Sequence, residues 1–198
     1  MKMLFSLLIC LSFASPLRAL DIGATAPDFS LLSCDGKTVK LSDYKGRIVV
    51  LEWFNLGCPF VVKHYKGGDM QALQKEYTQR DVIWLTINST HPNHQNFLTP
   101  TQAAAQCREQ NISSTAMLAD PDGKVGKSYG AKSTPHMFII GADGKLAYQG
   151  AIDDTAFPMG DPKKADNYVK KALNELLLGK PVSNPQTKQY GCSIKYAD

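Results

Sequence analysis

Apolar and polar residues are distributed along the chain in blocks that predict strands and helices in turn. An apolar, β-branched and aromatic run covers residues 48–54 and is interrupted only by Glu52. A run of this kind is typical of a strand that is buried on both faces of a sheet. It leads into Gly57-Cys58-Pro59, and Pro59 suits the first turn of a helix because its missing N–H is not needed there. We therefore predict a buried strand, a corner at Cys58 and a helix from Pro59.

The rest of the chain continues this alternation. A hairpin is expected across residues 31–42, because Asp35-Gly36 is a strong turn signal between two short runs. Further strands are predicted at residues 82–87, 116–118, 137–140 and 146–151. Helices are predicted at residues 69–79, 99–109 and 161–176, and a short one leads up to residue 129. Strands that alternate with helices in this way predict an α/β protein.

Residues 1–19 have the features of a cleaved secretory signal. Lys2 precedes an apolar stretch at residues 4–13, and small residues precede Ala19. The apolar stretch is too short to span a membrane. We expect an exported protein, secreted into a bacterial periplasm. Its mature part, residues 20–198, is expected to be one domain with a tail from about residue 180.

Charge and composition agree with one ordinary globular domain. The chain has 22 basic and 18 acidic residues, and removal of the signal would take away only Lys2 and Arg18 and leave a net charge of +2. So small a charge gives no reason to expect a nucleic-acid partner. No internal repeat or linker divides the remaining residues, which are numerous enough to bury one core.

The mature chain has four cysteines, Cys34, Cys58, Cys107 and Cys192. An oxidising compartment permits disulfides, and the sequence does not choose among the three full pairings. At the predicted corner, unpaired backbone N–H groups and the helix dipole favour the thiolate of Cys58, which is its reactive form. Cys34 is either an incidental small residue beside a turn or half of a structural disulfide, whereas Cys107 on an alanine-rich helix is expected to pack as a small apolar residue.

Several motifs together resemble the thioredoxin superfamily, and within it the peroxiredoxin-like redoxin branch of the AhpC/TSA type. They are the Glu-Trp pair at residues 52–53, the Gly-Cys-Pro-Phe-Val corner, the Lys-His-Tyr that follows it, Thr134-Pro135-His136 and the tail motif at residues 191–196. The resemblance extends from about residue 24 to the C-terminus. It implies a three-layer α/β/α fold with a central mixed sheet and an N-terminal β-hairpin. It also implies a cis Thr134–Pro135 bond against Cys58, with a buried acid, Glu52, beneath the cysteine.

The departures from the family pattern bear on the reaction. Dithiol reductases of the superfamily use Cys-x-x-Cys, but Val61 stands at the second position, so the local site is a monothiol. Peroxidatic members place Thr or Ser three residues before the cysteine, a proline before that, and an arginine on a later strand. This chain has Asn55 and Leu51 at the first two positions and no arginine after Arg108. Asn55 remains a candidate donor to a thiolate or a peroxide.

Glu52 allows two interpretations. A carboxylate in a buried strand is costly unless it is paired or protonated, which suggests a group with a raised pKa that exchanges a proton with Cys58. Alternatively, Glu52 faces the end of the sheet and pairs with a lysine or with water.

We predict an exported thiol-dependent oxidoreductase with an antioxidant role, in which Cys58 is the nucleophile. Its expected partners are a peroxide or a protein thiol or disulfide, and an external thiol reductant, with no cofactor, no metal and no membrane span. Cys192 is the predicted resolving thiol, because it lies in a mobile-looking tail that is long enough to reach back across the domain. Thr134 and Pro135 complete the predicted site.

Two other classes remain open. One is a non-catalytic binding module that presents the surface between Cys58 and Pro135. The other is a copper-delivery protein of the Cys-Pro-x-x-x-Cys kind, although Val62 stands where the second cysteine would be. His91 and His94 are expected to lie in a solvated loop rather than to bind a metal, since no third ligand is near them in the sequence.

Overall fold

The computed structural model describes residues 20–197. The predicted signal at residues 1–19 therefore lies outside the described residues. None of the helices within residues 20–197 has the length and the apolar character that a membrane span requires.

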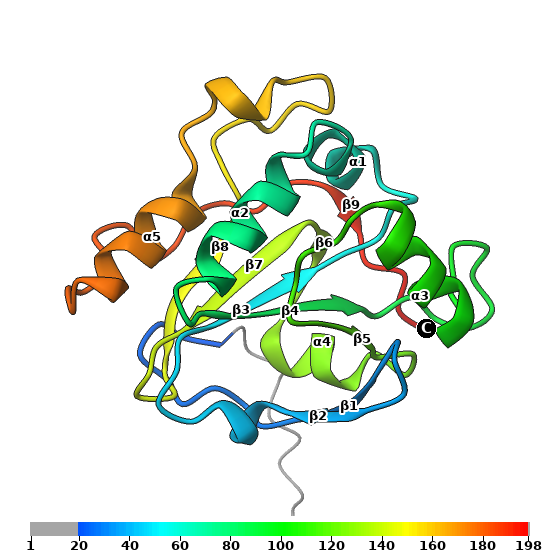
Figure 1. Ribbon diagram of the computed structural model, residues 1–198, viewed down its shortest axis with the longest axis horizontal. Coiled ribbons are helices and arrows are strands. Elements are labelled where there is room, and N and C mark those ends of the chain that lie inside the picture. The colour runs from blue at the N-terminus through cyan, green and yellow to red at the C-terminus, as the bar shows by residue number, and fades with distance from the viewer. Residues whose placement is uncertain (1–19, 198) are drawn as a thin grey trace, which may run out of the picture.

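A seven-stranded mixed sheet forms the centre of the molecule (Figure 1), with the strand order β2-β1-β5-β4-β3-β7-β8. The strands are β1 (Ser30–Ser33), β2 (Thr38–Lys40), β3 (Val49–Trp53), β4 (Ile83–Asn88), β5 (Ala116–Ala119), β7 (His136–Ile140) and β8 (Leu146–Gly150). Strand β3 is parallel to β4 and antiparallel to β7. All five residues of β3 are buried, as its unbroken apolar composition predicts. The predicted hairpin is formed by β1 and β2 at one edge.

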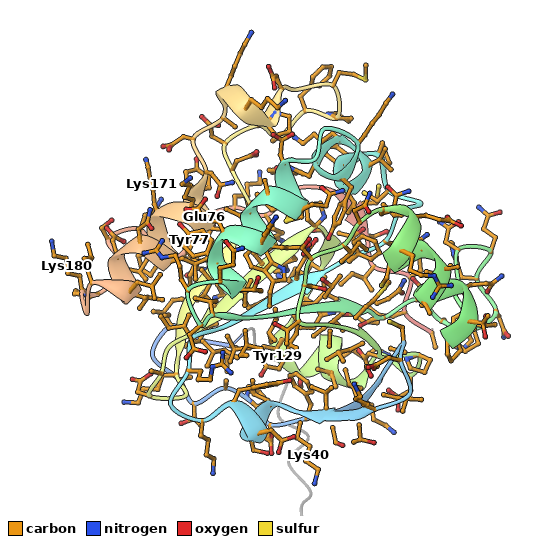
Figure 2. All side chains as sticks on the ribbon, in the orientation of Figure 1. Lys40, Glu76, Tyr77, Tyr129, Lys171 and Lys180 are labelled. Atoms are coloured by element: carbon orange, nitrogen blue, oxygen red, sulfur yellow. The ribbon has the colours of Figure 1, made fainter. Side chains whose placement is uncertain are left out.

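Helices cover both faces of this sheet (Figure 1). The helices are α1 (Pro59–Lys66), α2 (Asp69–Thr78), α3 (Pro100–Glu109), α4 (Lys124–Tyr129) and α5 (Tyr168–Leu177). Side chains from α1, α2, α3 and α5 pack into one apolar cluster, and those of α4 pack into a second cluster on the other face. Figure 2 labels one buried tyrosine from each side, Tyr77 of α2 and Tyr129 of α4. The predicted three-layer α/β/α fold is confirmed.

The last helix begins later than the sequence predicts. Its pattern suggested a start at Asp161-Pro162, but residues Pro162–Lys164 form only a 3-10 turn, and α5 starts after Asn167. The side chain of Asn167 accepts from the backbone N–H of Lys170 at 2.8 Å, which makes it a strong N-cap. Asn167 also forms an isolated bridge with Asp153. This pairing with the chain after β8 holds residue 167 in an extended conformation and delays the helix.

The C-terminal tail is docked along its length rather than mobile. Past α5 the chain follows β8, with Gln149 donating to the carbonyl of Pro185 at 3.0 Å and Thr187 donating to the carbonyl of Gln149 at 3.1 Å. It then forms β9 (Cys192–Ser193), which pairs antiparallel with β6 (Ser133–Thr134) in a small second sheet. A tail without periodicity of its own is therefore ordered by hydrogen bonds to distant strands.

Candidate active site

Cys58 is the N-cap residue of α1, at the corner that the sequence predicts. Its carbonyl accepts from the backbone N–H groups of Val61 and Val62, each at 3.0 Å. The residue is only 2% exposed, and its Sγ donates to the carbonyl oxygen of Thr134 at 2.9 Å. The sulfur is thus placed at the end of a helix and against the segment that precedes Pro135.

Asn55 shapes the turn that leads to Cys58. Its Oδ1 accepts from the N–H of Gly57 at 2.7 Å, and its carbonyl accepts from the N–H of Cys58 at 3.0 Å. Its Nδ2 donates to Oγ1 of Thr90 at 2.8 Å. One amide N–H and the amide oxygen are therefore engaged in holding the corner. Donation from Asn55 to a thiolate or a peroxide stays a prediction.

The Thr134–Pro135 peptide bond is cis, as predicted, and two cysteines lie at Thr134. The pairing of β6 with β9 sets Cys192 directly opposite Thr134. Thr134 also accepts the hydrogen bond from Cys58. Two cysteines that are 134 positions apart in the sequence therefore meet at the same residue.

Gly191 allows the tail to approach Thr134 this closely. Its φ is +130°, a conformation that residues with a side chain rarely adopt, and a Cβ at this position would collide with the carbonyl of Thr134. The glycine next to Cys192 is thus required by the geometry of the site.

Tyr190 anchors the tail on the other side of Gly191. Its hydroxyl donates to Oδ1 of Asp153 at 2.6 Å and lies 3.0 Å from Nε2 of His64. The ammonium of Lys63 lies 4.7 Å from the centre of its ring. Burial lowers the pKa of His64 to about 4, so the imidazole is neutral at pH 7. These contacts fix the tail two residues before Cys192.

The environment of Cys192 keeps its thiol protonated while the site is reduced. Burial raises the pKa of the Cys192 thiol to about 11, and a hydrogen bond with Cys58 and the charge of Cys58 act in the same direction. Of these three causes, burial is the one that does not depend on Cys58.

Glu52 lies between α1, α2 and β4, fully buried. Its carboxylate accepts from the hydroxyl of Tyr65 at 2.7 Å, from the amide of Gln74 at 3.0 Å and from the indole of Trp84 at 2.8 Å. Burial raises the pKa of Glu52 in spite of these hydrogen bonds. The side-chain partners of Glu52 among residues 20–197 are therefore not lysines, so the expected pairing with a lysine is wrong, whereas pairing with water stays a prediction. Its predicted proton exchange with Cys58 has no direct hydrogen bond between the two described side chains to support it.

Residues 22–149 match the AhpC/TSA family. The chain belongs to this family. It is 25% identical over 154 residues to the thiol-disulfide oxidoreductase ResA of Bacillus cereus, covering 77% of this chain and 79% of ResA. It is 26% identical over 167 residues to peroxiredoxin tpx1 of Schizosaccharomyces pombe, covering 83% of this chain and 77% of tpx1. A solved structure of an uncharacterized conserved protein from Geobacillus kaustophilus is 30% identical, with a TM-score of 0.77, and the match covers 90% of this chain and 93% of that one.

This AhpC/TSA membership confirms the predicted thioredoxin-superfamily relationship and the class of thiol-dependent oxidoreductase. The relatives include both a thiol–disulfide oxidoreductase and a peroxiredoxin. The choice between the two reactions therefore depends on the residues of the site.

Sequence reasoning missed the residues that brace the corner and the tail. Thr90 and Asn96 come from the loop before α3. Thr90 accepts a hydrogen bond from Asn55, and the amide of Asn96 lies where a Cβ of Gly57 would be.

The two histidines of this loop accept hydrogen bonds from nearby backbone N–H groups, and His94 accepts from Asn96 at 3.1 Å. Within residues 20–197 no group of three His, Cys, Asp or Glu side chains is arranged to hold a metal ion.

Proposed function

We propose that this AhpC/TSA protein catalyses thiol–disulfide exchange with Cys58 as the nucleophile and Cys192 as the resolving thiol. The observation that supports the proposal best is the meeting of the two cysteines at Thr134, which accepts the hydrogen bond of Cys58 and is paired in register with Cys192.

The reaction has two displacements. The thiolate of Cys58 attacks one sulfur of a substrate disulfide, and the other substrate sulfur leaves as a thiol. The thiolate of Cys192 then attacks Sγ of Cys58 and releases the second substrate thiol, which leaves a Cys58–Cys192 disulfide. An external thiol reductant returns this disulfide to two thiols. The electrons pass from the reductant to the substrate disulfide.

Exchange fits the site better than peroxide reduction does. Leu51 stands at the proline position of peroxidatic members, and Asn55 stands at the Thr or Ser position with its amide engaged by Thr90. The relationship to a peroxiredoxin makes a peroxide the second candidate substrate. In that case Cys58 becomes a sulfenic acid, and Cys192 displaces water from it to form the same disulfide.

The proposal includes export to the bacterial periplasm and an antioxidant role. Export is supported by the pattern of residues 1–19, and the antioxidant role by the relationship to a peroxiredoxin. Cell fractionation and N-terminal sequencing of the purified protein test export. A mature protein that begins near Leu20 is expected, and a cytoplasmic protein that retains Met1 would exclude export.

Peptide mapping after oxidation tests the pairing of cysteines. Wild-type protein that is treated with a stoichiometric small disulfide, and separately with hydrogen peroxide, should contain a Cys58–Cys192 disulfide. Cys192→Ser should instead accumulate the mixed disulfide, or the sulfenic acid, on Cys58. Cys107→Ser is the matched control, because it removes a thiol from elsewhere in the fold and should leave the Cys58–Cys192 disulfide intact.

Two results would overturn the proposal. One is Cys192 joined to Cys34 or Cys107 while Cys58 stays free. The other is a Cys58 that reacts with neither oxidant, which would favour a non-catalytic binding module.

A further inference from the structure

The two cysteines that the site does not use lie side by side. Sγ of Cys34 is 3.8 Å from Sγ of Cys107, although the residues are 73 positions apart in the sequence. Cys34 follows β1 in the hairpin turn, and Cys107 is in the last turn of α3. The contact therefore joins the edge hairpin to a helix.

Hydrogen bonds to β5 hold both residues in this position. The backbone N–H of Cys34 donates to the carbonyl of Met117 at 2.9 Å. Sγ of Cys107 donates to Sδ of Met117 at 3.2 Å, and its carbonyl accepts from the N–H of Ile112 at 2.9 Å. Both cysteines pack against the same apolar cluster as Cys58. The juxtaposition is therefore built from the backbone and is not an encounter of two long, free side chains.

We propose that Cys34 and Cys107 are a second redox-active pair, which forms a disulfide between the hairpin and α3 when a disulfide oxidant is present. The sulfurs are 3.8 Å apart and must approach to the disulfide bond length of about 2.05 Å. Cys34 attacks the oxidant and releases one thiol, and Cys107 then attacks Sγ of Cys34 and releases the other. The two cysteines lose two electrons and two protons, and the oxidant disulfide becomes two thiols.

The residues around Cys34 and Cys107 indicate which part of the fold their disulfide would constrain. A cavity of about 30 Å³ lies beside Cys34 and is lined by Thr90, Phe97 and Met117 among others. Thr90 holds Asn55 before Cys58, and the loop that contains Thr90 and Phe97 leads into α3. The disulfide would therefore fix the far end of the helix that follows this loop. Burial and the neighbouring Cys34 raise the pKa of Cys107 to about 12, which disfavours Cys107 as the first nucleophile.

The test separates this pair from the Cys58 site. The double variant Cys58→Ala, Cys192→Ala is incubated with glutathione disulfide, blocked with N-ethylmaleimide and mapped by mass spectrometry. A peptide pair that joins Cys34 to Cys107 is expected. The melting temperature should rise by about 5 to 15 °C over the reduced protein, because the disulfide closes a long loop of the unfolded chain. Addition of Cys34→Ala should abolish the rise.

Three outcomes would overturn the proposal. They are the recovery of Cys34 and Cys107 with maleimide on both after oxidation, a mapped disulfide of either with another cysteine, and a melting temperature that the Cys34–Cys107 bond does not raise. If the double variant fails to fold, the same mapping of the wild-type protein decides. The inference stands apart from the proposed function, since an unreactive Cys58 would leave its result unchanged.

Discussion

Gly191→Ala should weaken the pairing of Cys58 with Cys192 without changing either cysteine. At the φ of +130° that Gly191 adopts, a residue with a side chain costs about 1 to 3 kcal/mol. The alanine Cβ would also collide with the carbonyl of Thr134, which is backbone and has no flexible end to move away. The chain relieves both effects by lifting the tail away from β6, and Cys192 moves with it.

The magnitude follows from this cost. If about 1 to 3 kcal/mol falls on the docked tail, the effective concentration of Cys192 at Cys58 drops by about 5-fold to 150-fold, since 1.4 kcal/mol corresponds to a factor of ten. Equilibration with mixtures of reduced and oxidised glutathione measures this quantity directly. Peptide mapping then quantifies the Cys58–Cys192 disulfide separately from any disulfide that contains Cys34 or Cys107.

Gly179→Ala is the matched control. Gly179 has a φ of +70° at the end of α5, and no atom lies within 4 Å of its Cβ position. The control therefore imposes backbone strain without a collision and away from the site. It should lower the free energy of unfolding but leave the glutathione equilibrium within about 2-fold of wild type. An unchanged equilibrium in Gly191→Ala, or an equal change in both variants, would refute the role of the tail geometry.

Three further predictions concern ionisable groups. Glu52→Gln should unfold with nearly the same free energy as wild type at pH 4.5, because the protonated carboxyl and the amide each present one donor end and one acceptor end to the same neighbours. The raised pKa of Glu52 means that wild type loses stability relative to the variant as the pH rises through that pKa. Urea unfolding at several pH values measures this difference, and a wild type that gains stability relative to the variant would contradict the assignment. Closure of the Cys58–Cys192 disulfide should accelerate as the pH rises above 7, because burial, the largest cause of the raised pKa of Cys192, persists after Cys58 is bonded to a substrate. A flat pH profile in stopped-flow measurements would argue against Cys192 as the attacking thiol. The lowered pKa of His64 implies that stability is lost as the pH falls from 6.5 to about 4, and His64→Gln should reduce that loss in urea unfolding measured across this range.

The sequence was sufficient for features that depend on neighbouring residues. The buried strand before Cys58, the helix from Pro59, the helix predicted at residues 99–109 and the Asp35-Gly36 hairpin each follow from a few adjacent side chains, and the structure has all of them. The family resemblance supplied the long-range element, the Thr134–Pro135 corner.

Contacts between distant segments were beyond the sequence pattern. The start of α5 was misplaced because Asn167 pairs with Asp153 in a segment that has no helical signal. The tail was interpreted as mobile because its hydrogen-bond partners, such as Gln149, lie on strands already assigned to the sheet. The spacing of apolar residues describes one segment at a time. It does not indicate which distant strand or side chain that segment will contact.

If Cys192 is the resolving thiol, as we propose, the second reactant of the site comes from the tail rather than from position 61. Cys58 is 2% exposed, and we predict that a substrate disulfide reaches it only after the tail has lifted from Thr134. The first displacement therefore requires the tail to be open, and the second requires it to be closed. A change that loosens the tail should speed the first and slow the second. In Gly191→Ala, alkylation of Cys58 by iodoacetamide should accordingly become faster while closure of the Cys58–Cys192 disulfide becomes slower. If both rates moved in the same direction, the tail would be acting on the reactivity of Cys58 rather than on access to it.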